Sequence, residues 1–189
     1  MTGEHPVTIH SMASRTGRRD KTLDVVPVSE NAMTVIATLR DTSVALGDPN
    51  DVEVIHDLRL EATVSLPDLT IDDVNGVAQR QPYEQCALTV ATLGRLRGLS
   101  LQRGYRREVM ERLGGTQSCS HFLTLALELS AANVLSIYLR MRATVENTDH
   151  NRGDGTWAGA GLDVEPGLVN ACLALAEDSP VIRQARGRS

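Results

Sequence analysis

Aromatic residues are scarce in this sequence: 189 residues hold one Phe, one Trp and three Tyr. The hydrophobic core must therefore be aliphatic, built from Leu, Val, Ile and Ala. Proteins that bind single-stranded nucleic acid stack the bases on aromatic rings, and this chain offers few. Its formal net charge of −5 also argues against a nucleic-acid binder. We therefore expect no nucleic-acid partner.

Long apolar runs and cysteines are also few. No stretch approaches the roughly eighteen apolar residues of a membrane span, and the polar N-terminal segment has no apolar core of a signal peptide. We expect a cytoplasmic protein that does not bind membranes. The three cysteines, Cys86, Cys119 and Cys172, cannot all pair. In a reducing compartment their thiols stay free for chemistry or metal binding.

The pattern along the chain predicts one folded domain with loose ends. Residues 1–31 are polar and lack sustained periodicity, so we expect them to be mostly disordered, with one short extended piece around Asp24–Val28 as an alternative. A single domain is predicted over residues 32–182. Within it, the Gly- and Asp-rich segment 146–167 is typical of a long loop, and residues 183–189 form a basic tail.

The first half of the domain shows the two-residue period of β-strands. Residues 33–39 and 52–64 alternate, and His56 falls on the apolar side of the second strand. Turn residues follow at 47–50 and at Pro67-Asp68, so residues 69–78 return as a hairpin strand, with a bulge near 74–77.

The second half is helical. Helices are predicted at 82–97, 103–113, 119–141 and 168–176 from apolar spacing, Pro82 at a helix start and glycines at helix ends. Strands followed by helices indicate an α+β fold: an antiparallel sheet of three to four strands, covered on one face by helices. The apolar 119–141 helix could also pack against a second copy, as in a homodimer.

Two cysteines stand where helices begin. Cys86 lies in the first turn of one predicted helix and Cys119 beside the start of another, where the helix dipole and free N–H groups stabilise a thiolate. His121 follows two residues after Cys119, and His56 points towards the helix-covered face. We predict that these four side chains form one thiol–imidazole cluster. The alternative is that each is an ordinary core residue.

The chemistry of such a cluster depends on how many side chains converge. Four would make an N2S2 set suited to tetrahedral zinc, with iron also possible. Three would leave an open position for an activated water. Without a metal, a cysteine and an imidazole form a nucleophile–base pair.

Further candidates lie nearby. Asp41 ends a predicted strand and could stand at the rim of the site, although a surface turn is the alternative. Tyr83 and Glu84, beside Cys86, could supply an acid or an orienting hydrogen bond. Cys172 could be a further ligand, with a core position as the alternative.

Several segments of the chain resemble a bacterial family known as domain of unknown function 2889. They are His56-Asp57-Leu58-Arg59-Leu60, Pro82-Tyr83-Glu84-Gln85-Cys86, Leu96-Arg97-Gly98, Leu113-Gly114-Gly115 and Ser118-Cys119-Ser120-His121-Phe122. The resemblance covers residues 33–180, and its most specific part is the Cys-x-His segment. Ser118 and Phe122 stand where the family has Gly and Leu. The resemblance implies no established activity.

A second resemblance, in topology, is to NifU-like iron–sulfur scaffold proteins. These also place a hairpin before a cysteine-led helix, and a later cysteine at the start of a long Ala/Leu-rich helix, as Cys86 and Cys119 are placed here. Their intervening cysteine has no counterpart in residues 87–118. The resemblance implies a NifU-like arrangement of the fold, by analogy only.

From these observations we expect a small metal-dependent enzyme. Zinc or iron would be held by His56, Cys86, Cys119 and His121, and a small organic substrate would undergo hydrolytic, lyase or isomerase chemistry. One alternative is a non-catalytic scaffold that carries a metal or sulfur. The other is a metal-free enzyme with a cysteine nucleophile.

Overall fold

The structure, a computed structural model, describes residues 14–187. The chain divides into two compact units, Met1–Ala132 and Asn133–Ser189, instead of the single domain predicted over 32–182.

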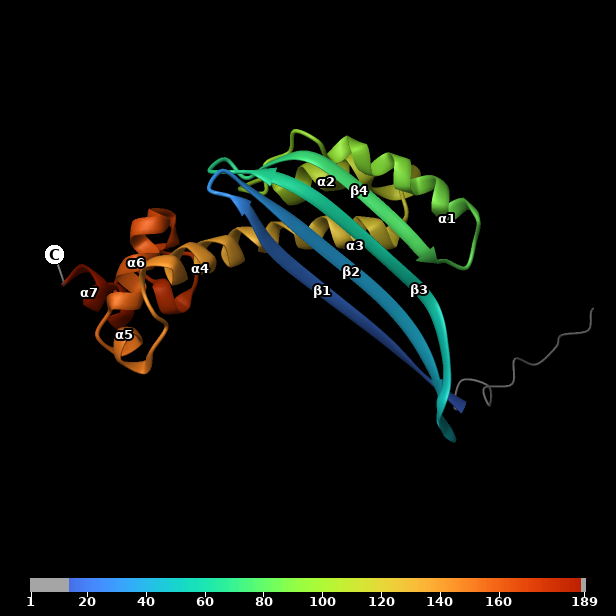
Figure 1. Cartoon of the computed structure of the whole chain (residues 1–189), viewed down its shortest axis with the longest axis horizontal. Helices are drawn as coiled ribbons and strands as arrows, with labels where there is room; N and C mark the ends of the chain where they lie inside the picture. The colour runs from blue at the N-terminus through green and yellow to red at the C-terminus, as the bar shows by residue number, and fades with distance from the viewer. Residues whose placement is uncertain (1–13, 188–189) are drawn as a thin grey trace, which may run out of the picture. The chain divides into compact units, whose positions relative to one another are not determined.

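Unit 1 is built on a four-stranded antiparallel sheet (Figure 1). Its strands, in the order in which they pair, are β1 Arg15–Ser29, β2 Ala32–Ala45, β3 Asp48–Ser65 and β4 Thr70–Arg80. The order is that of a simple meander, each strand pairing with the next. The predicted α+β fold with an antiparallel sheet in the first half is therefore confirmed.

Strand β1 corrects the prediction of a disordered segment over residues 1–31; residues 1–13 lie outside the described part. Nearly all of Arg15–Ser29 is exposed, with only Arg15, Leu23 and Val25 half-buried. An edge strand with so little burial lacks apolar alternation, the signal on which strand prediction depends. Backbone pairing with β2 along its length defines the strand instead.

The central strands follow the predicted alternation. Their inward side chains are fully or almost fully buried: Met33, Val35, Ala37 and Leu39 on β2, and Leu58, Leu60, Ala62 and Val64 on β3. Register shifts place the bulges of β4 at Asp72 and Gln79 rather than at the predicted 74–77. Gly76 does not form the predicted bulge. A Cβ at this position would clash with the Leu93 side chain, so the glycine permits a helical segment to approach the strand closely.

Helical segments pack on the inward face of the sheet and close the core (Figure 1). In chain order they are α1 Gln85–Leu88, η2 Thr89–Leu96, α2 Tyr105–Leu113, η3 Gly115–Gln117, α3 Ser120–Glu128 and η4 Leu129–Ala131. The helix predicted over 82–97 is thus one α-helical turn followed by a 3-10 helix. Hydroxyl groups explain the tighter winding, because Thr89 and Thr92 each donate to the carbonyl three residues earlier.

Unit 2 is helical, and it corrects three predictions. Its helices are α4 Ala132–Thr144, α5 Asp149–Gly153, α6 Thr156–Val164, η5 Pro166–Leu168, η6 Leu173–Leu175 and α7 Pro180–Arg186. Helices α5 and α6 occupy most of the segment predicted as a loop over 146–167. The Thr148 hydroxyl caps α5, and Gly155, the N-cap residue of α6, adopts a positive φ. In place of the helix predicted over 168–176, the structure has the end of η5 at Leu168 and the short 3-10 turn η6. Most of the predicted basic tail belongs to α7, which Ser179 caps.

The apolar helix predicted over 119–141 is present as α3, η4 and α4. By length and composition this run, Ser120–Thr144, could cross a membrane, and 39% of its most apolar window is buried. Buried core helices of soluble proteins meet the same criterion, so the cytoplasmic location stays a prediction.

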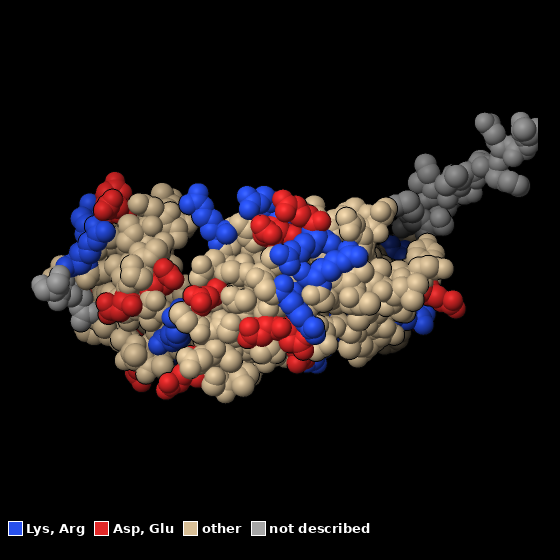
Figure 2. All heavy atoms as spheres, turned by 90° about the horizontal axis from the view of Figure 1, so that it is seen from above, with Lys and Arg blue, Asp and Glu red and all other residues tan. Residues whose placement is uncertain are grey.

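Charges of both signs are interspersed on the face shown in Figure 2, with wide uncharged areas between them. Exposed ion pairs of unit 1 follow the same pattern; Arg112–Glu108 and Arg97–Asp73 are examples. Pairs of this kind contribute little to stability, and neighbouring opposite charges cancel at a distance.

Candidate functional site

Three neighbouring strands and one helix bring four polar side chains together inside unit 1. In the sheet register, Arg19 of β1 stands opposite Asp41 of β2, and Asp41 stands opposite His56 of β3. Directly beyond the second pair, a register shift leaves Ile55 as an extra residue on β3. Bulges of this kind bend a strand and redirect its side chains. The fourth side chain, His121, comes from the first turn of α3.

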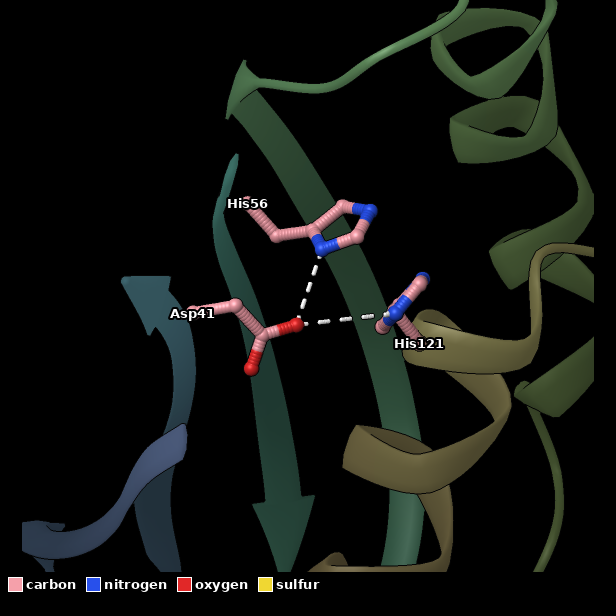
Figure 3. A group of neighbouring side chains, drawn as sticks. All are labelled: Asp41, His56 and His121. Atoms are coloured by element: carbon pink, nitrogen blue, oxygen red, sulfur yellow. Dashed lines mark hydrogen bonds and ion pairs between the residues drawn. The ribbon is translucent and has the colours of Figure 1, made fainter. Parts of the chain in front are cut away.

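Asp41 lies at the centre of the cluster (Figure 3). Its Oδ2 is 2.8 Å from Nδ1 of His56 and 3.7 Å from Nε2 of His121. The two imidazole rings lie almost against each other, with centroids 3.9 Å apart and planes tilted by 35°. One ligand atom from each of Asp41, His56 and His121 lies within 4.8 Å of the other two.

Arg19 holds both carboxylate oxygens of Asp41, including the Oδ2 that accepts from His56. Its Nε donates to Oδ1 at 2.7 Å and its Nη2 to Oδ2 at 2.8 Å, the two-pronged geometry that arginine makes with carboxylates. The guanidinium holds the pKa of Asp41 below its ordinary value, and His56 adds to the effect while burial opposes it. Asp41 is therefore a fixed anion, although only 8% of the residue is exposed.

Cys119 contacts the other nitrogen of His121. The residue is the N-cap of α3, so its backbone is extended and its side chain is not on the helix surface. This explains how two residues only two apart in sequence can meet: Sγ lies 3.5 Å from Nδ1 of His121. Burial, followed by the charges of His56 and Arg19, lowers the pKa of His121.

A cavity of about 440 Å³ opens beside the cluster. It is lined by His56, Pro82, Tyr83, Gln85, Cys86, Thr89, Cys119, Ser120 and His121. The four residues predicted to form one cluster therefore do face one space. The Ser118 hydroxyl donates to the Thr92 hydroxyl at 2.9 Å, because the Thr92 hydrogen is already given to Thr89. This bond connects the segment after Cys86 to the segment before Cys119.

The residues predicted for the cluster do not all bring a ligand atom to the same point. Within residues 14–187, no group of three potential ligand atoms includes the sulfur of Cys86 or Cys119. The tight group contains Asp41 instead, which the sequence suggested only for the rim. Tyr83 lines the cavity, whereas Glu84, the N-cap of α1, is not among its lining residues. Cys172, in unit 2, is an exposed free thiol and is not among the lining residues.

Sequence reasoning missed Arg19 entirely. The residue lies in the segment expected to be disordered, and nothing local distinguishes it from the neighbouring Arg15 and Arg18. Only the pairing of β1 with β2 shows that it faces Asp41. The available signal was Asp41 itself, because a carboxylate at the end of an apolar strand face needs a cationic partner.

The cluster has a donor set that suits a divalent metal ion. A carboxylate and two imidazoles are ligands of zinc and of non-haem iron(II). Bonds of about 2.0–2.2 Å to one ion place neighbouring ligand atoms roughly 3–3.5 Å apart. The observed separations of 2.8 and 3.7 Å bracket that range, so the three side chains could hold an ion with small rotations.

The fold and the cluster define an α+β protein with a carboxylate–imidazole site at its sheet. The family described as "Protein of unknown function (DUF2889)" matches residues 17–135, well over half of the chain, and the protein belongs to it. The match includes Arg19, Asp41, His56, Cys119 and His121, whereas most of unit 2 lies beyond it. No curated protein and no solved structure matches the chain. A NifU-like arrangement therefore stays a prediction.

Proposed function

We propose that this protein is a metal-dependent enzyme in which Asp41, His56 and His121 hold zinc or iron. The substrate is a small organic molecule bound in the adjacent cavity, and the reaction is hydrolytic, a lyase reaction or an isomerisation. The observation that carries the proposal is the convergence of three ligand atoms within 4.8 Å from β2, β3 and α3. It revises the expected ligand set, with Asp41 in place of the two cysteines.

The surroundings of the three side chains support this assignment. Three protein ligands leave a coordination position open for water or substrate, as catalytic sites require. The cavity borders both imidazoles, so a bound molecule reaches that position. Two of the three ligands border a cavity, which favours catalysis over a scaffold, for which we expected exposed ligands on a flat surface.

The neighbouring residues have distinct roles in this proposal. Arg19 keeps Asp41 ionised and fixed, as a ligand must be. Cys119, at Nδ1 of His121, orients that ring so that Nε2 faces Asp41. Tyr83 lines the cavity, where its hydroxyl can donate a proton or a hydrogen bond to the substrate.

Elemental analysis of the purified full chain tests the proposal. We expect about one zinc or iron per chain, which is lost in His121→Ala and in Asp41→Asn. The matched control is Asp57→Asn: Asp57 neighbours His56 but interacts with Arg40 on the other side of the strand. Protein that stays metal-free after incubation with Zn²⁺ or Fe²⁺, while correctly folded, would overturn the proposal.

A second candidate is metal-free catalysis by Cys119, which the 3.5 Å contact between its sulfur and His121 favours. His121 would accept the thiol proton and Asp41 would steady the imidazole, the logic of a nucleophile–base pair. Iodoacetamide distinguishes the candidates, because the exposed Cys172 provides an internal reference. If Cys119 is the nucleophile, it is alkylated faster than Cys172 despite being less exposed, and His121→Ala removes the difference. A slower Cys119 contradicts this candidate.

A further inference from the structure

We propose that the substrate of this site carries a carboxylate that binds the metal ion directly, attached to a body without charge. The inference rests on the proposed metal site and adds the chemical class of its substrate. It follows from the charges around the site and from the composition of the cavity wall.

The protein groups at the metal site sum to zero charge. Asp41 contributes −1, but Arg19 contributes +1 through two hydrogen bonds to the same carboxylate. Imidazoles bind metals in their neutral form. A divalent ion therefore leaves a net charge of +2 in a location where the Asp41, His56 and His121 side chains are only 12–20% exposed. Such a charge on largely buried ligands is stabilised by an anionic partner that enters from the cavity.

No other described protein group supplies that partner. The cavity lining contains no Asp or Glu within the described residues, and Asp57 interacts with Arg40. Neither cysteine sulfur belongs to the group of ligand atoms that lie within 4.8 Å of one another. A metal-bound water that loses a proton contributes one negative charge, which still leaves the site cationic. An anionic substrate group completes the balance.

The cavity wall indicates what the rest of the substrate is like. Its lining includes no Lys or Arg either, among the residues that the structure describes. Pro82, Tyr83, Thr89 and Cys86 offer apolar surface, with hydroxyl and amide groups for a few hydrogen bonds. A second charged group on the substrate would have no partner in this space. The carboxylate therefore binds at the metal end, and an uncharged body of modest size fills the cavity of about 440 Å³.

Benzoate and benzamide form a matched pair of probes, because they share their shape and differ in charge. We expect the Zn²⁺-loaded full chain to bind benzoate at least about tenfold more tightly than benzamide in calorimetry. The metal-free protein should show no such preference. In the Co²⁺-loaded protein, benzoate but not benzamide should change the visible absorption spectrum, which reports a change of metal ligands.

Substitutions of Arg19 test the charge argument. Arg19→Gln lowers the net charge by one, so benzoate binding should weaken by about tenfold, whereas Arg19→Lys, which retains the charge, should keep most of the affinity. Arg15→Gln is the control, because Arg15 lies on the same strand and makes the same kind of fork with Asp51.

The outcomes separate the two proposals. Stoichiometric zinc with equal affinity for benzoate and benzamide overturns the inference and leaves the metal site standing. Benzoate binding that is the same with and without zinc also overturns it. A folded protein that takes up no metal overturns the proposed function, and this inference with it.

Discussion

Replacing Asp41 by Asn should be one of the most destabilising single polar substitutions in unit 1. The carboxylate accepts two hydrogen bonds from Arg19 and one from His56, at 2.7–2.8 Å. An asparagine keeps one acceptor and turns an NH₂ group towards the remaining donors. Hydrogen bonds to a charged group contribute about 1.5–3 kcal/mol each. The Arg19 side chain is 45% exposed, and water screens that pair, so we discount the sum to about 2–3 kcal/mol.

Urea denaturation followed by far-ultraviolet circular dichroism measures this loss. Asp57→Asn serves as the control, because its ion pair with Arg40 is long and partly exposed, and surface changes cost at most about 0.5 kcal/mol. The denaturant slope should be unchanged in both variants. An Asp41→Asn protein as stable as the Asp57→Asn protein would refute the view that Asp41 is a fixed, hydrogen-bonded anion.

The same substitution predicts a pH dependence. Because the pKa of Asp41 is lower in the folded state than in the unfolded chain, the unfolded state takes up a proton first as the pH falls. The stabilisation is therefore complete above the ordinary aspartate value of about 4 and is lost as the pH falls through the folded-state pKa. The difference in unfolding free energy between wild type and Asp41→Asn should shrink in acid. A constant difference from neutral pH into acid would contradict this assignment.

Three further predictions concern other positions. The lowered pKa of His121 means that its protonation opposes folding as the pH falls below about 6.5; the Tm of His121→Asn should fall less between neutral and mildly acidic pH, and equal slopes would contradict this. Gly76→Ala should cost about 1–3 kcal/mol in urea denaturation because its Cβ meets the Leu93 side chain; Gly17→Ala, with open space around it, is the control. Ser179→Ala removes the cap of α7 and should cost about 1 kcal/mol; a change below the error of the measurement would show that the cap is not needed.

The strands could be predicted from the sequence where one of their faces is buried, because burial produces an alternation of apolar and polar residues. Strands β2 and β3 are buried on one face, so their alternation marks them clearly. Strand β1 is exposed along most of its length, and its sequence records no such pattern. The prediction of a loop over 146–167 was wrong for a different reason. Gly and polar residues begin short helices in this segment, and the same residue types are also common in loops.

The sequence indicated candidate site residues where a His or Cys stands on an apolar strand face or at a helix start. His56 stands on an apolar strand face and the Cys119–His121 pair at a helix start; all three line one cavity, and their role in a site stays a prediction. Asp41 was undervalued because strand pairing, which places it opposite His56, is not a local property of the sequence. Placing Arg19 beside the imidazoles requires two strand pairings, β1 with β2 and β2 with β3. The pattern of a single sequence contains neither pairing.

The two candidate functions assign opposite tautomers to His121. If a metal binds at Nε2, the proton lies on Nδ1, which then donates to the sulfur of Cys119. If Cys119 is a nucleophile, its thiol donates to Nδ1 in the neutral resting state, and the proton of His121 lies on Nε2, facing Asp41. The nitrogen chemical shifts of this one ring therefore distinguish a metal ligand from a general base before any substrate is known. A proton on Nε2 in protein incubated with Zn²⁺ would exclude His121 as a ligand through that atom and leave the cysteine as the reactive group.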